Sequence, residues 1–190
     1  MIWLLLVMAC ASMVAVIVAY ATKKLLTLPR PPVRPLPDGF AVLYEPVEFT
    51  TADGVTVRGW FFPQSGGPVI VYCPGRGQGL NAFDFRYAPL FHRAGYQVLM
   101  FDWRGMGASD GQTSMGYWER LDLQAAVAYV RQRGIVTRIG AMGTSLGAAV
   151  VFLAASEIPD LSAVAGECAF ATFEGMIASA MHGVYGVPML

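Results

Sequence analysis

The chain has 190 residues, enough for one domain, and its 13 basic and 13 acidic side chains give a formal net charge of zero. Hydrophobic residues make up 55% of the sequence and charged residues only 14%, more apolar than is usual for a fully soluble protein. Residues 1–37 hold four basic side chains and no acidic one, so the remainder carries nine basic against 13 acidic side chains, a net charge of −4. Without a basic stripe, this remainder is not expected to bind nucleic acid.

Residues 1–22 predict a transmembrane helix. No charged side chain precedes Lys23, and about 20 apolar residues are enough to cross a bilayer. Basic residues follow at once, so the positive-inside rule predicts a single-pass membrane protein with its folded domain in the cytoplasm. A cleaved signal peptide ending at Ala19-Tyr20-Ala21 is the alternative, and it would make the protein secreted or periplasmic.

Residues 23–39 predict a stiff, basic, proline-rich linker, because five prolines lie between Leu28 and Gly39. Residues 40–190 then predict one folded domain. The chain's cysteines are Cys10, Cys73 and Cys168, and their number and spacing indicate neither a disulfide framework nor a zinc site.

Strands and helices alternate along this domain. Residues 42–50 and 55–62 predict a hairpin, with turn residues at 51–54, and residues 68–73 and 96–102 predict buried strands. Helices are predicted over 81–94, over 117–133 and after residue 147, with further strands over 137–142 and 161–166. The apolar face of the 117–133 helix is expected to hold Leu121, Ala125, Ala128 and Tyr129. This order predicts a mostly parallel α/β sheet with helices on both faces and functional residues at the carboxyl ends of its strands.

The pentapeptide Gly143-Thr144-Ser145-Leu146-Gly147 joins a predicted strand to a predicted helix. A serine on such a sharp turn exposes its hydroxyl, and the flanking glycines let the helix pack close to the strand. An ordinary serine at a helix N-terminus is the alternative interpretation, and it is compatible with the first.

Two further blocks precede this turn in the chain: Tyr72-Cys73-Pro74-Gly75-Arg76-Gly77, and the run from Phe101 to Gly111, FDWRGMGASDG. With the pentapeptide they resemble the α/β-hydrolase superfamily, most closely its membrane-anchored, serine aminopeptidase-like branch, over about residues 42 to 175. The resemblance implies a serine hydrolase that acts on esters, thioesters or amides through an acyl-enzyme. It implies a small or lipid-like acyl substrate and no metal or organic cofactor.

The same resemblance assigns roles to individual residues. Ser145 would be the nucleophile, and the backbone N–H groups of Leu146 and Arg76 would stabilise the oxyanion. Pro74 stands where the family usually has a histidine. Asp102 and Arg104 are expected to build the floor of the site rather than to contact substrate.

The acid and the base of a catalytic triad are harder to place. In this family the order is serine, acid, histidine, but only 45 residues follow Ser145, and the predicted strands end at the sixth. We therefore expect an incomplete sheet, truncated at its C-terminus, whose missing strands would carry both groups. Glu167 is the in-chain candidate for the acid, with a structural glutamate as the alternative. His182 lies in an apolar segment and His92 precedes the serine, so neither suits the base.

Two other functions stay open. The chain could be a non-catalytic, membrane-anchored fragment or binding protein with a hydrolase-like fold. It could also bind a ligand in an apolar pocket around Tyr117, Trp118, Phe170 and Phe173.

Overall fold

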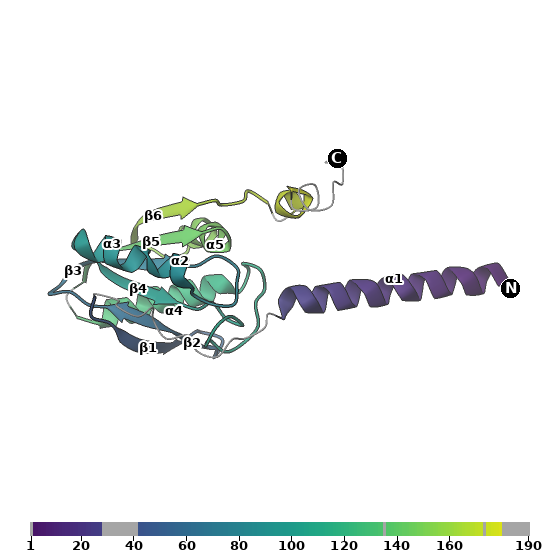
Figure 1. Cartoon of the computed structure of the whole chain (residues 1–190), viewed down its shortest axis with the longest axis horizontal. Helices are drawn as coiled ribbons and strands as arrows, with labels where there is room; N and C mark the ends of the chain where they lie inside the picture. Colours follow the sequence, from purple (N-terminus) through teal and green to yellow (C-terminus); the bar gives the residue numbers. More distant parts are fainter. Residues whose placement is uncertain (1, 28–41, 135, 173, 180–190) are drawn as a thin grey trace.

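The computed structural model describes residues 2–27, 42–134, 136–172 and 174–179. Its centre is a six-stranded sheet in the order β1-β2-β4-β3-β5-β6 (Figure 1). The strands β4, β3, β5 and β6 are parallel, and the hairpin β1-β2 adds to β4 in the antiparallel direction. The strands are β1 (Glu45–Thr50), β2 (Thr56–Phe62), β3 (Gly67–Cys73), β4 (Gln97–Phe101), β5 (Val136–Thr144) and β6 (Leu161–Glu167).

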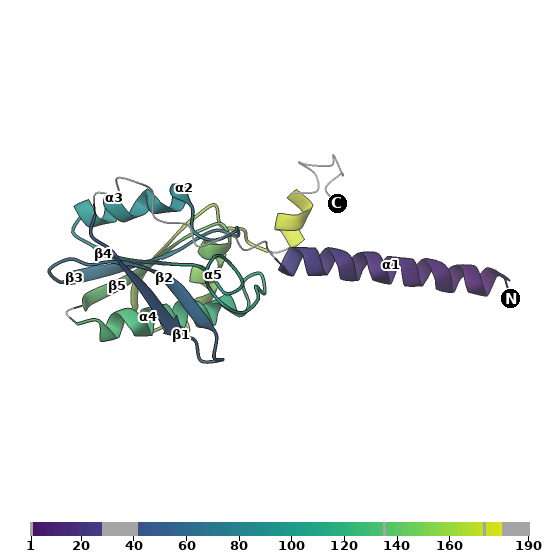
Figure 2. The ribbon, with the colours of Figure 1, turned by 60° about the horizontal axis from the view of Figure 1, so that its bottom comes forward.

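Helices cover both faces of the sheet, as predicted (Figure 2). On one face, α2 (Ala82–Phe85) and α3 (Tyr87–Arg93) pack over a core that includes Phe62, Tyr72 and Met100. On the other face, α4 (Glu119–Gln132) and α5 (Leu146–Ala154) pack over the larger core. The mostly parallel α/β sheet predicted from the alternation of elements is confirmed.

The predicted 81–94 helix is present but interrupted at Arg86, where α2 ends and α3 begins. Proline at position 89 explains the break, because it has no N–H to donate to the carbonyl of Phe85 four residues earlier. Asn81 caps the start of α2 through its side chain, which accepts the N–H of Phe83, and Gly95, with a φ of 87°, follows the end of α3.

The predicted apolar face of α4 was only partly right: Ala125 and Tyr129 pack against the core, but they lie at its margin. The buried positions are Leu123, Ala126, Val127 and Val130, whereas Ala128 is exposed. Two acidic residues, Glu119 and Asp122, share this inner face and are fully buried. A pattern that counts only apolar residues misses positions where hydrogen-bonded carboxylates point inward.

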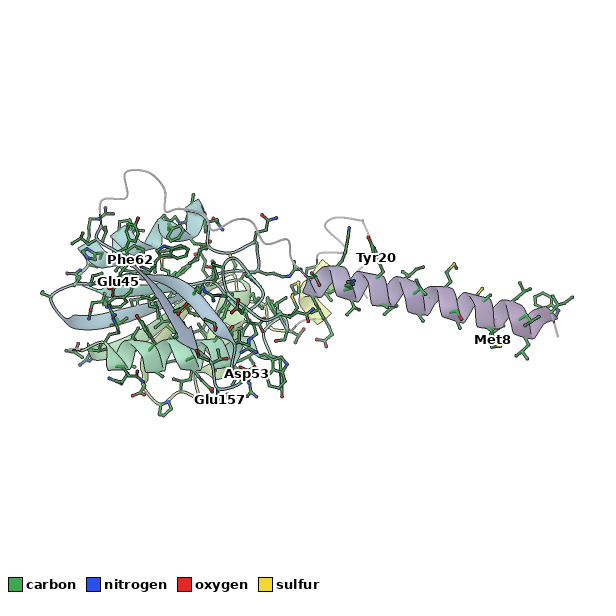
Figure 3. The ribbon with its side chains drawn as sticks, turned by 90° about the horizontal axis from the view of Figure 1, so that it is seen from below. Met8, Tyr20, Glu45, Asp53, Phe62 and Glu157 are labelled. Carbon is green, nitrogen blue, oxygen red and sulfur yellow. The ribbon has the colours of Figure 1, made fainter. Side chains whose placement is uncertain are left out.

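The N-terminal helix α1 spans Ile2–Leu26 and continues four residues beyond the predicted end at residue 22. Lys23 and Lys24 lie in its last turn, where positive side chains suit the negative end of the helix dipole. Met8 and Tyr20 illustrate how its side chains project outward, and no other described part of the chain packs around the apolar span (Figure 3). By length and composition the helix could cross a membrane, but a signal sequence would pass the same test. The rest of the predicted linker, from residue 28, lies outside the described residues.

Candidate active site

Ser145 is the single residue between the end of β5, at Thr144, and the start of α5, at Leu146. Its φ of 51° and ψ of −113° are strained values for a residue with a side chain. The serine is exposed, and its side chain makes no capping hydrogen bond to the helix. The hydroxyl of Ser145 therefore does not cap the helix, which argues against the ordinary N-cap interpretation.

The two flanking glycines are required by close contacts. A Cβ atom on Gly147 would lie 2.0 Å from the carbonyl oxygen of Cys73, and one on Gly143 would lie 2.2 Å from the carbonyl carbon of Gly147. Both distances are far below van der Waals contact, and both partners are backbone atoms. Only glycine lets α5 begin this close to the ends of β3 and β5.

The loop that follows β3 passes beside the serine. A Cβ atom on Gly75 would lie 3.5 Å from the Cβ of Ser145 and 3.5 Å from the carbonyl oxygen of Thr144. Pro74 is buried and Arg76 is exposed. The structure thus brings together the two segments, Pro74–Gly77 and Ser145–Leu146, that the sequence assigned to one site.

Trp103 holds this loop, and sequence reasoning missed it. Its indole N–H donates to the carbonyl oxygen of Pro74 at 2.7 Å, and its side chain is fully buried. A tryptophan directly after a buried strand end was the available signal, because a buried indole N–H needs an acceptor.

Asp102 ties two loops together beneath the site. Its carboxylate accepts the N–H of Leu80 at 2.6 Å and the N–H of Ala108 at 3.0 Å. Burial raises the pKa of Asp102 to about 6, although the two N–H donors favour the charged form. This geometry supports a role in shaping loops.

Arg104 is equally structural in its contacts. It is buried between Asp53, at 2.7 Å, and Asp122, at 2.8 Å, and so joins the β1-β2 turn to α4. Hydrogen bonds from Arg104 lower the pKa of Asp53 to about 2. The guanidinium is fully engaged by these carboxylates.

Glu167 lies at the end of β6, level with Thr144 at the end of β5. Its backbone carbonyl accepts the N–H of Ser145 at 2.8 Å, and its carboxylate accepts the hydroxyl of Tyr87. The in-chain acid candidate is therefore beside the serine, half-buried and engaged with a tyrosine that sequence reasoning did not connect to it.

Of the two histidines, the structure describes only His92, and it does not lie beside the serine. His92 lies on α3, where its ring nitrogen Nε2 is 3.0 Å from the carbonyl oxygen of Pro63, just after β2. This is the edge of the sheet opposite the carboxyl ends of the parallel strands. His182 lies outside the described residues.

A half-open apolar hollow of about 600 Å³ lies between the start of α4, one side of α5 and the segment after β6. Tyr117 and Phe170, predicted to line such a pocket, do line it, together with Phe152 and Leu153 of α5. Trp118 is not among its lining residues, and position 173 is outside the described chain.

Comparisons with known proteins give a consistent result. Residues 68–190 match the family model described as alpha/beta hydrolase fold. The solved structure of the Pyrococcus furiosus esterase Pf2001 superimposes with a TM-score of 0.78 and 27% identity, over 86% of this chain and 63% of the esterase.

Among curated proteins, polyketide transferase grgF from a Penicillium species is 36% identical over 116 residues, or 58% of this chain and 40% of that protein. Thiohydrolase apmlB from Arthrinium phaeospermum is 32% identical over 132 residues, or 66% of this chain and 43% of that protein. The chain thus spans less than half the length of these two relatives.

Proposed function

Because the chain belongs to the alpha/beta hydrolase fold family, we propose that it contributes the nucleophile of a serine hydrolase that acts on small acyl substrates. The observation that carries this proposal is the exposed, strained Ser145 beside the Pro74–Gly77 loop. Similarity to an esterase and to a thiohydrolase supports esters and thioesters as the substrate class, with amides as a further possibility.

In the proposed reaction a base takes the proton of the Ser145 hydroxyl while its Oγ attacks the substrate carbonyl. The bond to the alcohol or thiol then breaks, and this group leaves with the proton, which gives an acyl-enzyme. Water attacks the acyl-enzyme, releases the acid and returns a proton to the Oγ of Ser145. The backbone N–H groups of Leu146 and Arg76 stabilise the negative oxygen that develops during the attack. Leu146 begins α5, so the positive end of that helix adds to the stabilisation.

The acid and the base complete this mechanism. Glu167 is the candidate acid within the described residues, because it lies beside Ser145 at the edge of the sheet. A histidine base would have to come from beyond the described part of the chain, since His92 lies at the opposite edge. We further propose that α1 anchors the protein in a membrane, with the folded domain in the cytoplasm. A domain held at the membrane surface would meet lipid-like acyl substrates.

A fluorophosphonate probe tests the nucleophile, because it reacts with activated serines. We expect it to label the full chain at the Ser145 peptide, and Ser145→Ala to abolish labelling. Ser156→Ala, at an exposed serine after α5, is the matched control and should label like the wild type. Labelling that survives Ser145→Ala would refute the assignment of the nucleophile.

A non-catalytic binding protein is the second candidate, favoured by the absence of a described histidine next to Ser145. A chain that folds but leaves the probe unreacted would support this candidate. The membrane proposal has its own test: a reporter fused near Pro37 should be cytoplasmic, and a periplasmic signal would reverse the orientation.

A further inference from the structure

We propose that two stacked tyrosines, Tyr72 and Tyr87, are positioning residues that hold Ser145 at the end of the sheet. The proposal rests on the nucleophile role given to Ser145 above. The two rings stack with their centroids 5.0 Å apart, on the face of the sheet covered by α2 and α3. Each hydroxyl reaches the end of a different strand.

Tyr72 secures the end of β5. Its hydroxyl donates to the Oδ1 of Asp84 at 2.8 Å and lies 2.6 Å from the Oγ1 of Thr144. Because the tyrosine proton goes to Asp84, the Thr144 hydroxyl donates to Tyr72. Thr144 directly precedes Ser145, so this chain of hydrogen bonds anchors the sharp turn at Ser145, here called the elbow, from its N-terminal side.

Asp84 makes this anchor rigid. It is buried at the start of the α2 region, and its second oxygen, Oδ2, accepts the N–H of Asn81 at 2.9 Å. Burial raises the pKa of the Tyr72 phenol, so the hydroxyl stays protonated and keeps donating. Hydrogen bonds through Tyr72 and Asp84 thus connect Thr144 to the backbone at the start of α2.

Tyr87 secures the end of β6. Its hydroxyl donates to the Oε2 of Glu167 and accepts from the guanidinium of Arg86 at 2.9 Å. The backbone carbonyl of Glu167 in turn accepts the N–H of Ser145 at 2.8 Å. The tyrosine pair therefore fixes both Thr144, covalently joined to Ser145, and Glu167, hydrogen-bonded to it.

The strained backbone of Ser145 needs contacts of this kind to stay in its conformation. A non-glycine residue at φ 51° persists only where its surroundings over-determine it. Loss of either tyrosine hydroxyl would let the elbow relax and shift the serine Oγ relative to the amides of Leu146 and Arg76. A shift of this kind slows reaction without removing any reacting group.

Phenylalanine substitutions isolate the hydroxyls, because the stacked rings remain. We expect Tyr72→Phe and Tyr87→Phe in the full chain, in detergent, to react with the fluorophosphonate about tenfold more slowly than the wild type. Tyr129→Phe makes the same chemical change on the opposite face, where Tyr129 stacks on Phe49, and should react at the wild-type rate. Equal rates for Tyr72→Phe and Tyr129→Phe would overturn the proposal.

Substitutions at position 144 separate positioning from packing. Thr144→Val keeps the shape and loses the hydroxyl, so it should be slow, whereas Thr144→Ser keeps the hydroxyl and should restore most of the rate. If both variants react alike, the hydrogen bond to Tyr72 does not position the serine. These variants also serve if Tyr72→Phe fails to fold.

Hydrogen exchange separates this proposal from the proposed function. If the wild-type chain is never labelled, the nucleophile role has failed, and amide exchange in the peptide covering residues 144–149 decides whether the tyrosines hold the elbow. Faster exchange in Tyr72→Phe and Tyr87→Phe, but not in Tyr129→Phe, would support the anchor. Unchanged exchange in both would refute it.

Discussion

Replacing Gly147 with alanine tests the close approach on which the candidate site depends. The added methyl group would lie 2.0 Å from the carbonyl oxygen of Cys73 and 2.6 Å from that of Pro74. An ordinary contact begins at 3.4 Å, so α5 and the end of β3 must separate by about 1.4 Å. Overpacking against backbone costs about 3 kcal/mol, and the better helix propensity of alanine returns about 1 kcal/mol.

We therefore expect Gly147→Ala to lose about 2 kcal/mol of unfolding free energy, measured by urea titration of the full chain in detergent. For a chain of this size the melting temperature should fall by about 4–8 °C. Labelling of Ser145 should also slow, because Leu146 moves away from the Pro74–Gly77 loop. The outcome that refutes this reasoning is wild-type stability together with wild-type labelling.

Gly140→Ala is the matched control within β5. Its added methyl group would meet only the flexible end of Ile70, at 3.2 Å, and the carbonyl oxygen of Ala163, at 3.6 Å. The side-chain tip can move, so we expect a stability change within about 1 kcal/mol. An equal loss in both variants would show that α5 is not the feature that Gly147 protects.

Three other predictions concern residues under the site. Arg104→Met should lower the free energy of unfolding, measured by urea titration, by about 3–5 kcal/mol, because Asp122 stays buried without its cation. Adding Asp122→Leu to the same chain should recover part of this loss. Additive losses would contradict the pairing. Asp102 has a folded pKa near 6 against an ordinary 3.8, so its contribution is complete below pH 3.8 and lost as the pH rises through 6. Relative to Asp102→Asn, the wild type should therefore lose about 3 kcal/mol between pH 3.5 and 7, and parallel pH profiles would refute this. Trp103→Phe should slow Ser145 labelling and cost about 1–3 kcal/mol, because the buried Pro74 carbonyl loses its donor, whereas Trp118→Phe, at an exposed site, should do neither.

The sequence predicted those parts of the site whose cause is local. Glycine at 143 and 147 around a serine indicated a sharp turn, and the structure places Ser145 on one with a positive φ. The loop beginning at Pro74 followed a buried strand, and parallel strands end at the same edge, so its approach to the serine could be expected.

Contacts between distant residues could not be predicted in this way. Tyr72 and Thr144 are 72 positions apart, and Tyr87 and Glu167 are 80 apart, so no spacing rule connects them. Part of the inner face of α4 was missed for a related reason, since the buried Asp122 pairs there with Arg104, which comes from another loop. Such side chains look solvent-exposed until the fold supplies their partners.

The geometry of the candidate site is therefore a property of strand register more than of the pentapeptide itself. Three strand ends hold the elbow: β3 through the contact of Gly147 with Cys73, β4 through the bond from Trp103 to Pro74, and β6 through the bond from Ser145 to Glu167. A strained serine can persist there because the contacts come from the ends of three different strands. The apolar hollow beside α5 is also lined by Leu153, which belongs to none of these three contacts, so Leu153→Ala should change which ligand the hollow accepts without altering the rate of Ser145 labelling.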